Sequence, residues 1–200
     1  MGVAMDLRRK QLLVGAIPAA IFVPLALLLT MVPFLEPPGS VDLGERGLSG
    51  IMDHRQQIEN MSNPISRAIY SFGDSSCHQN SSRSFFFHGN QTPVCSRDMG
   101  IYWGFAAGAV VALLRRYYVP LSLVLLSFVP MGADGLIQAF TSYTSTNLIR
   151  PLTGFPPSLL LSMTLVYSLQ EMVYIPQGDL REVTSTGLSG GVEHQNDLGR

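Results

Sequence analysis

The sequence predicts an all-α integral membrane protein, a four-transmembrane-helix bundle with a structured extracytoplasmic loop. Hydrophobic residues make up 46% of the chain and charged residues only 14%, against about 25% charged residues in an average soluble domain. The charges are also segregated, so that four long stretches contain almost none. The formal net charge of -1 argues against a nucleic-acid partner, because such proteins usually carry a basic surface.

Four apolar runs account for the predicted spans, since a helix needs about 20 mostly apolar residues to cross a bilayer. A cleaved signal peptide is the rival interpretation of the first run, which follows the basic residues 8–10. The length of this run and the sequence Glu36-Pro37-Pro38 at its end favour an uncleaved anchor. The last run follows Pro156-Pro157, which suits a helix start. The predicted spans are 12–35, 99–118, 119–141 and 157–176.

Basic residues predict the orientation of these spans, because short cytoplasmic segments are enriched in arginine and lysine. Two spans separate the cluster at residues 8–10 from Arg115-Arg116, so both clusters fall on the same side. We therefore expect a multi-pass protein of the cell membrane with the N-terminus, 1–11, and the C-terminal tail, 177–200, in the cytoplasm. The loops 36–98 and 142–156 lie outside in this topology. The tail is polar and expected to be disordered.

The long outer loop contains a helical pattern ahead of its cysteines. Apolar residues recur there at steps of three and four, and Asn63-Pro64 supplies a helix cap and a first-turn proline. One or two amphipathic helices are predicted, which would lie on the membrane or on the bundle. The apolar positions are Ile58, Met61, Ile65, Ile69 and Phe72.

Glycines recur every four residues on one face of the second span, at Gly100, Gly104 and Gly108. A stripe of small residues lets another membrane helix approach closely. The stripe predicts helix packing, and a homo-oligomer formed through this face is a further possibility.

The outer loop also holds the only two cysteines of the chain, Cys77 and Cys95, for which three interpretations compete. A disulfide would close a loop of 17 intervening residues and would stabilise the fold by roughly 3 kcal/mol. A metal site would use the thiols with neighbouring donors of the kinds that zinc takes. A redox pair that exchanges electrons with a membrane quinone ranks last, because no Cys-x-x-Cys motif is present. The candidate metal ligands are Cys77, His78, His88, Cys95 and Asp98.

A second polar group lies at the outer end of the third span. A carboxylate such as Asp134 costs roughly 2.5–3.5 kcal/mol at membrane depth on insertion scales, so it should face the bundle and have a partner. Gln138 shares its helix face, and Arg150 could pair with it from the following loop. One interpretation is a structural ion pair, and the other is a polar catalytic pocket that opens outward. The pocket would consist of Asp134, Gln138, Asn147 and Arg150.

Three arginines of the outer region could together bind an anion such as a phosphate or carboxylate head group. Solvated arginines beside anionic lipids explain them equally well. They are Arg83, Arg97 and Arg150.

Several separated motifs resemble an uncharacterised family of bacterial and archaeal membrane proteins, domain of unknown function 2085. The resemblance spans roughly 69–167, and it implies a polytopic membrane protein without an assigned activity. Members of the family often have a cysteine at the position of Asp98, and this implies metal binding as much as a disulfide, because aspartate can replace cysteine as a zinc ligand. The motifs are Cys77-His78-Gln79, Arg83-Ser84-Phe85, Pro93-Val94-Cys95-x-Arg97, Gly100-Ile101-Tyr102-x-Gly104-Phe105, Asp134-Gly135-x-x-Gln138, Ser145-x-Asn147-x-x-Arg150 and Thr153-Gly154.

The leading hypothesis joins the cysteine and histidine cluster to the polar pocket. A metal ion, with zinc as the candidate, would activate water against a lipid or lipid-phosphate head group. The alternative is a non-enzymatic membrane binding or assembly module clipped by a disulfide. The bilayer is the expected partner in both cases, and the sequence leaves open whether the protein is an enzyme.

Overall fold

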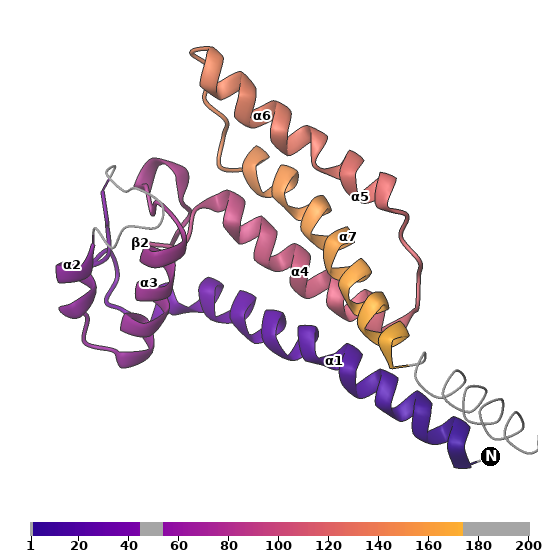
Figure 1. The fold of residues 1–200 in the computed structure, drawn as a ribbon. Coiled ribbons are helices and arrows are strands. Elements are labelled where there is room, and N and C mark those ends of the chain that lie inside the picture. The colour runs from indigo at the N-terminus through magenta and orange to yellow at the C-terminus, as the bar shows by residue number, and fades with distance from the viewer. Residues whose placement is uncertain (1, 45–53, 174–200) are drawn as a thin grey trace, which may run out of the picture.

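The computed structural model describes residues 2–44 and 54–173, and helices dominate its architecture (Figure 1). Long helices form a bundle, and a small lobe, defined here as residues 32–44 and 54–95, lies at one end of it. The elements in chain order are α1 (Gly2–Met31), η1 (Val32–Leu35), α2 (Arg55–Glu59), α3 (Pro64–Ser76), η2 (Ser81–Arg83), β1 (Phe86–Phe87), β2 (Asn90–Gln91), α4 (Ser96–Leu114), α5 (Leu121–Ser127), α6 (Val129–Phe140) and α7 (Ile149–Met172).

Three helical segments within the described residues are long and apolar enough to cross a membrane: Arg8–Leu35, Leu121–Phe140 and Ile149–Met172. The remaining predicted span corresponds to α4, whose first turn carries two charged residues and whose later turns are apolar. This helix packs against both α1 and α7 and lies between them (Figure 1). The fold is therefore that of a mostly helical membrane protein.

The glycine face of α4 is filled by α7. A Cβ added to Gly100 would lie 2.5 Å from the Pro151 Cα, and one added to Gly104 would lie 2.5 Å from the Phe155 carbonyl oxygen. Such distances are too short for a real side chain, so the two backbones meet only because the glycines have none. The predicted helix packing is thus present. The homo-oligomer predicted through this face stays a prediction.

Two helix boundaries differ from the sequence prediction. The third predicted span is divided at Phe128 into α5 and α6, because Pro130 opens the new helix and cannot donate to the preceding turn. The last helix begins at Ile149, so that Pro156 and Pro157 lie inside α7 rather than at its start. Membrane helices tolerate internal prolines when neighbouring helices support them, and α4 packs along α7 here.

The lobe contains the two helices predicted for the loop, α2 and α3. Asn63 caps α3 by accepting a hydrogen bond from the Ile65 N–H at 2.8 Å, and Pro64 occupies the first turn. The expected apolar face is only partly buried, since Ile65 is 50% exposed and Phe72 36% exposed. The buried face of α3 is instead rotated toward small and polar residues: Ser66, Tyr70, Gly73 and Asp74.

A two-stranded hairpin follows, and the all-α prediction missed it. Strand β1 pairs antiparallel with β2, and the turn residues His88 and Gly89 have φ angles of 55° and 76°. Two successive residues with positive φ are typical of the tightest hairpin turns. The polar tail 177–200, predicted to be disordered, lies outside the described residues.

Candidate functional site

The two cysteines meet where α3 ends and α4 begins. Cys77 is the C-cap of α3, and its N–H donates to the Gly73 carbonyl at 2.8 Å. Cys95 is the N-cap of α4, and its N–H donates to the Cys77 Sγ at 3.2 Å. Both thiols are free and buried. Two residues that are distant in sequence are therefore held side by side by the ends of two helices.

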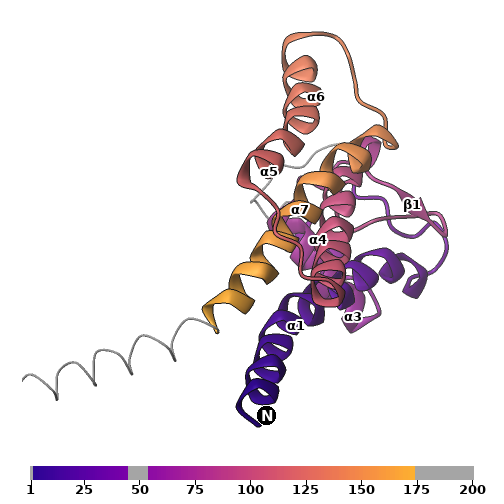
Figure 2. The same ribbon diagram turned by 90° about the vertical axis from the view of Figure 1, so that its right-hand side faces the viewer.

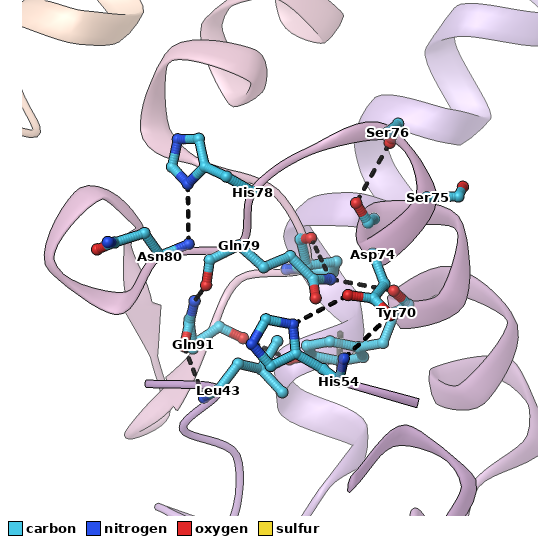
Figure 3. A network of polar contacts seen from close by, with 12 residues as sticks. Leu43, His54, Tyr70, Asp74, Ser75, Ser76, His78, Gln79, Asn80 and Gln91 are labelled. Carbon is cyan, nitrogen blue, oxygen red and sulfur yellow. Dashed lines mark hydrogen bonds and ion pairs between the residues drawn. The ribbon is translucent and has the colours of Figure 1, made fainter. Parts of the chain in front are cut away.

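Buried glutamines hold this junction together (Figure 3). The Gln79 Nε2 donates to the Tyr70 carbonyl at 3.0 Å and to the Pro93 carbonyl at 2.8 Å. It thereby ties the end of α3 to the segment that carries Cys95. Gln91 donates to the Gln79 carbonyl and accepts from the Leu43 N–H at 2.8 Å, which connects the hairpin to the start of the lobe.

Gly73 permits the close approach of these segments. A Cβ at this position would lie 2.7 Å from the Gln79 Nε2 and 2.8 Å from the Pro93 carbonyl carbon. Any side chain would therefore push the Pro93 backbone away from α3 and separate the two thiols.

His78 and Asp98 complete the cluster around the thiols. One donor atom each from Cys77, His78 and Cys95 lies within 4.8 Å of the others. The His78 Nδ1 accepts the Asn80 N–H at 3.0 Å (Figure 3), so in the neutral ring the proton is on Nε2. Asp98 adjoins both thiols from the first turn of α4.

Electrostatic interactions within the cluster shift the pKa values of the two thiols in opposite directions. Hydrogen bonding from Cys77, and secondarily from His78, lowers the pKa of Cys95 against the opposing effect of burial. Its place at a helix N-terminus acts in the same direction. Hydrogen bonding to Cys95 and burial raise the pKa of Cys77. Burial, followed by the charge of Cys95, raises the pKa of Asp98 to about 6.

His88, a predicted metal ligand, is not part of this group. It occupies the hairpin turn, where its ring lies 5.8 Å from that of Phe34, and its carbonyl accepts the Gly39 N–H at 3.3 Å. Its role in the structure is that of a turn residue.

Asp134 is buried and paired, but its partner differs from the predicted one. It forms an ion pair with Arg97 of α4, and the Gln138 Nε2 donates to its carboxylate at 2.8 Å. Arg150 does not pair with Asp134. Its guanidinium instead donates to the Asn147 Oδ1 at 2.9 Å.

Asn147 connects the segment before α7 to the lobe. Its Oδ1 also accepts from the Ser96 hydroxyl at 3.1 Å, and its Nδ2 donates to the Ser84 carbonyl at 3.0 Å. The contacts of this amide are therefore all with protein groups of the lobe and the two helix starts, which makes it a positioning residue for Arg150.

A pocket of about 210 Å³ joins the thiol cluster to the polar group. It lies where the lobe, the starts of α4 and α7, and the end of α6 meet. All three predicted anion-binding arginines line it. Asp134 and Asn147 are outside the lining, and they contact Arg97 and Arg150 respectively. The lining residues are Ser76, His78, Arg83, Cys95, Arg97, Asp98, Gln138 and Arg150.

Several organising residues were not singled out by the sequence as candidates. Gln79 and Gln91 are fully buried. The feature of the sequence that could have identified them is the recurrence of amide residues near the cysteines. A buried pair, His54 and Asp74, has 2.9 Å between Nδ1 and Oδ1 (Figure 3). This pair does not line the pocket.

The fold and the site define a helical membrane protein with a small polar lobe at one end of its helices. The family described as "Predicted membrane protein (DUF2085)" matches residues 77–164, which include both cysteines, the three arginines and Asp134. The chain belongs to this family, and the predicted resemblance is confirmed.

Two archaeal relatives are similar to the chain over most of their own length. An uncharacterised protein of Methanocaldococcus jannaschii is 30% identical over 115 residues, which cover 55% of this chain and 74% of the relative. An uncharacterised protein of Methanothermobacter thermautotrophicus is 34% identical over 90 residues, which cover 42% of this chain and 78% of the relative. No solved structure matches.

Proposed function

We propose that this protein holds a zinc ion at the extracytoplasmic ends of its helices and uses it to hydrolyse an ester in a lipid head group. The observation that carries the proposal is the cluster of Cys77, Cys95 and His78, with Asp98 next to the thiols, beside a pocket that three arginines line. Soft donors bind the metal in this arrangement, and the arginines face an anionic substrate.

We infer that this pocket lies outside the cell. We infer that α4 is a fourth span, because it packs between α1 and α7 and is apolar beyond its first turn. The Gln11 Nε2 donates to the Gln170 carbonyl at 3.3 Å, and Arg116 pairs with Glu171. The two basic clusters therefore adjoin the same end of α7, which the enrichment of basic residues in cytoplasmic segments assigns to the cytoplasm. The lobe lies at the opposite end of the helices (Figures 1 and 2), and the pocket is lined partly by lobe residues.

The donor set fits a zinc site with one open position. Zinc takes thiolate, imidazole and carboxylate ligands, and catalytic sites use three of them and leave the fourth position for water. Because the Asn80 N–H donates to the His78 Nδ1, the His78 Nε2 carries a proton and has no lone pair for a metal. Cys77, Cys95 and Asp98 are then the three ligands, and His78 is a hydrogen-bond donor beside them.

Zinc would supply Lewis acidity to such a site. In the hydrolysis, the oxygen of water bonds to the ester centre, the bond to the leaving oxygen breaks, and that oxygen takes up a proton. That proton comes from the attacking water, and the neutral His78 Nε2–H donates a hydrogen bond at the edge of the pocket. Arg97, which is held by its ion pair with Asp134, lines the same pocket.

Metal content in detergent-purified, untagged protein tests the proposal. We expect about one zinc per chain in the wild type, loss of zinc in Cys95→Ser and Asp98→Ala, and retained zinc in His78→Ala. Asp98→Cys is the matched conservative variant and should keep the metal, because a thiolate replaces a carboxylate ligand. Loss of zinc in His78→Ala would indicate a closed four-ligand site and would overturn the hydrolytic function. Absence of metal from the wild type would overturn the whole proposal.

A disulfide-clipped assembly module is the second candidate, and the closeness of the two buried thiols favours it. Cysteine pairs outside the cytoplasm usually oxidise. Peptide mapping of protein alkylated during cell lysis separates the two functions. A linked Cys77–Cys95 peptide together with absent zinc supports the clip, whereas two alkylated thiols together with bound zinc exclude it.

A further inference from the structure

We propose that Arg83 and Arg150 form a binding subsite for a phosphate monoester, with Arg97 beside them. As a substrate assignment this rests on the proposed function, since hydrolysis needs the metal. Phosphate binding itself needs only the arginines, so the two ideas can fail separately.

Arg150 carries the strongest argument, because it is a buried charge whose direct hydrogen-bond partner is a neutral amide. It is 5% exposed, and its guanidinium donates a hydrogen bond to the side-chain oxygen of Asn147. It forms no ion pair with any carboxylate within the described residues. A buried charge is costly unless it is paired and hydrogen-bonded. An anion in the pocket would supply the missing partner.

The residues around Arg150 also favour a bound anion. The positive charges of Arg83 and Arg97 act on it more strongly than the opposing negative charges of Cys95 and Asp134 do. Arg97 is neutralised by Asp134, but its Nε is buried without a hydrogen-bond partner. Arg83 is exposed, lines the same pocket and has no ion pair among the residues described. Two of the three guanidinium charges are therefore unmatched.

The N-termini of two helices add to the positive electrostatic potential of the pocket. Arg97 and Arg150 are the second residues of α4 and α7. Helix N-termini carry partial positive charge, so an arginine in the first turn is unfavourable there unless an anion is bound. The N–H groups of such termini also bind phosphate. Two helix starts and two unmatched guanidiniums thus surround one pocket of about 210 Å³.

The charge of the site selects among anions. A phosphate monoester carries about -1.5 to -2 at neutral pH, which matches two guanidiniums, whereas a carboxylate or a phosphodiester carries one negative charge. Arginine also binds phosphate oxygens through two parallel hydrogen bonds. Cys95 and Asp98 are the acidic groups of the pocket lining; both belong to the metal ligands in the proposed function and lie on the thiol side of the pocket.

Calorimetric titration of the full-length protein in detergent tests the subsite, with inorganic phosphate as the probe. We expect binding to chelator-treated, zinc-free wild type, and binding about tenfold weaker in Arg83→Gln, because one charge-assisted interaction is lost. Arg83 suits this test because its side chain is exposed. Arg150→Lys keeps the charge but loses the planar guanidinium, and it should also weaken binding. Arg67→Gln, an exposed arginine of α3, is the matched control and should bind as the wild type does.

The outcomes separate this proposal from the zinc site. Phosphate binding that requires zinc and ignores the arginine variants would overturn the subsite and leave the metal standing. Acetate that binds as tightly as phosphate would overturn the assignment to a dianion. Phosphate binding by a wild-type protein that contains no zinc as purified, before any chelator is added, would overturn the proposed function alone.

A second arm identifies the source of the phosphate. Vesicles of phosphatidylcholine containing phosphatidic acid are compared with vesicles containing phosphatidylglycerol, which is a diester. Preferential binding to phosphatidic acid that Arg83→Gln weakens supports a lipid source. Binding of free phosphate without this preference supports a soluble one.

Discussion

The lobe and the α5–α6 segment are stabilised in opposite ways. Fully buried polar side chains fill the centre of the lobe, and the amides of Gln79 and Asn90 donate to backbone carbonyls of other segments. In α6 the one buried residue is Asp134, while apolar side chains such as Phe140, 84% exposed, project outward. A membrane span satisfies its backbone internally and needs apolarity on its surface. A polar lobe needs particular partners at particular distances, so single substitutions should affect the two regions very differently.

The largest effect is expected at Gly73. Gly73→Ala should destabilise the lobe by about 3 kcal/mol, because the new Cβ meets backbone that cannot rotate away. Thermal unfolding and maleimide labelling of Cys77 and Cys95 measure the effect, and labelling should become faster. Ser75→Ala, at an exposed position of the same helix, is the control and should change little. A Gly73→Ala protein with wild-type stability and protected thiols would show that the segments are loosely packed.

Gln79 should come next. Its φ angle of 43° favours residues that tolerate the left-handed region, so Gln79→Asn keeps the backbone but shortens the side chain. The carbonyls of Tyr70 and Pro93 lose their donor, at a cost of about 2 kcal/mol for two buried acceptors. Denaturant unfolding followed by thiol exposure checks this value. Gln56→Asn, an exposed change of the same kind in α2, should cost almost nothing, and equal effects of the two would contradict a polar core.

This contrast also explains what the sequence could predict. Apolar runs identify spans because any apolar residue can occupy a lipid-facing position. The glycine face of α4 and the Asn63 cap could be predicted because each depends on residues that are close together in the sequence. The predicted start of α7 was wrong, because the sequence does not distinguish a proline pair inside a helix from a proline pair at its start.

The site itself was only partly predictable. The sequence grouped Cys77, His78, Cys95 and Asp98 because they share short motifs, and the structure brings them together. It gave Asp134 the wrong arginine, because the choice between Arg97 and Arg150 depends on the register between α4 and α6. His88 could not be recognised as a turn residue without the strands around it.

The ion pair between Asp134 and Arg97 is the polar contact that connects α6 to α4. Asp134→Asn should weaken this connection by about 1 kcal/mol, since Arg97 is partly exposed to solvent. Spin labels on α4 and α6 should report a broader distance distribution. Gln138→Ala is the control, because it removes a hydrogen bond to Asp134 but keeps the ion pair. An unchanged distribution in Asp134→Asn would mean that apolar packing alone positions α6.

The smallest effect is expected at Gly132 of α6, where an added Cβ meets nothing within 4 Å. Gly132→Ala should therefore stabilise the helix slightly, by about 0.5–1 kcal/mol, because alanine loses less backbone entropy than glycine. Thermal unfolding in lipid nanodiscs, beside Gly73→Ala in the same lipid, measures the difference directly. Replacing a helix glycine with alanine changes the stability in opposite directions in the two regions only if the α6 face contacts lipid chains, which can rearrange around the new methyl group. Destabilisation by Gly132→Ala would mean that another protein surface packs against this face in the membrane, and α6 would then depend on specific partners as the lobe does.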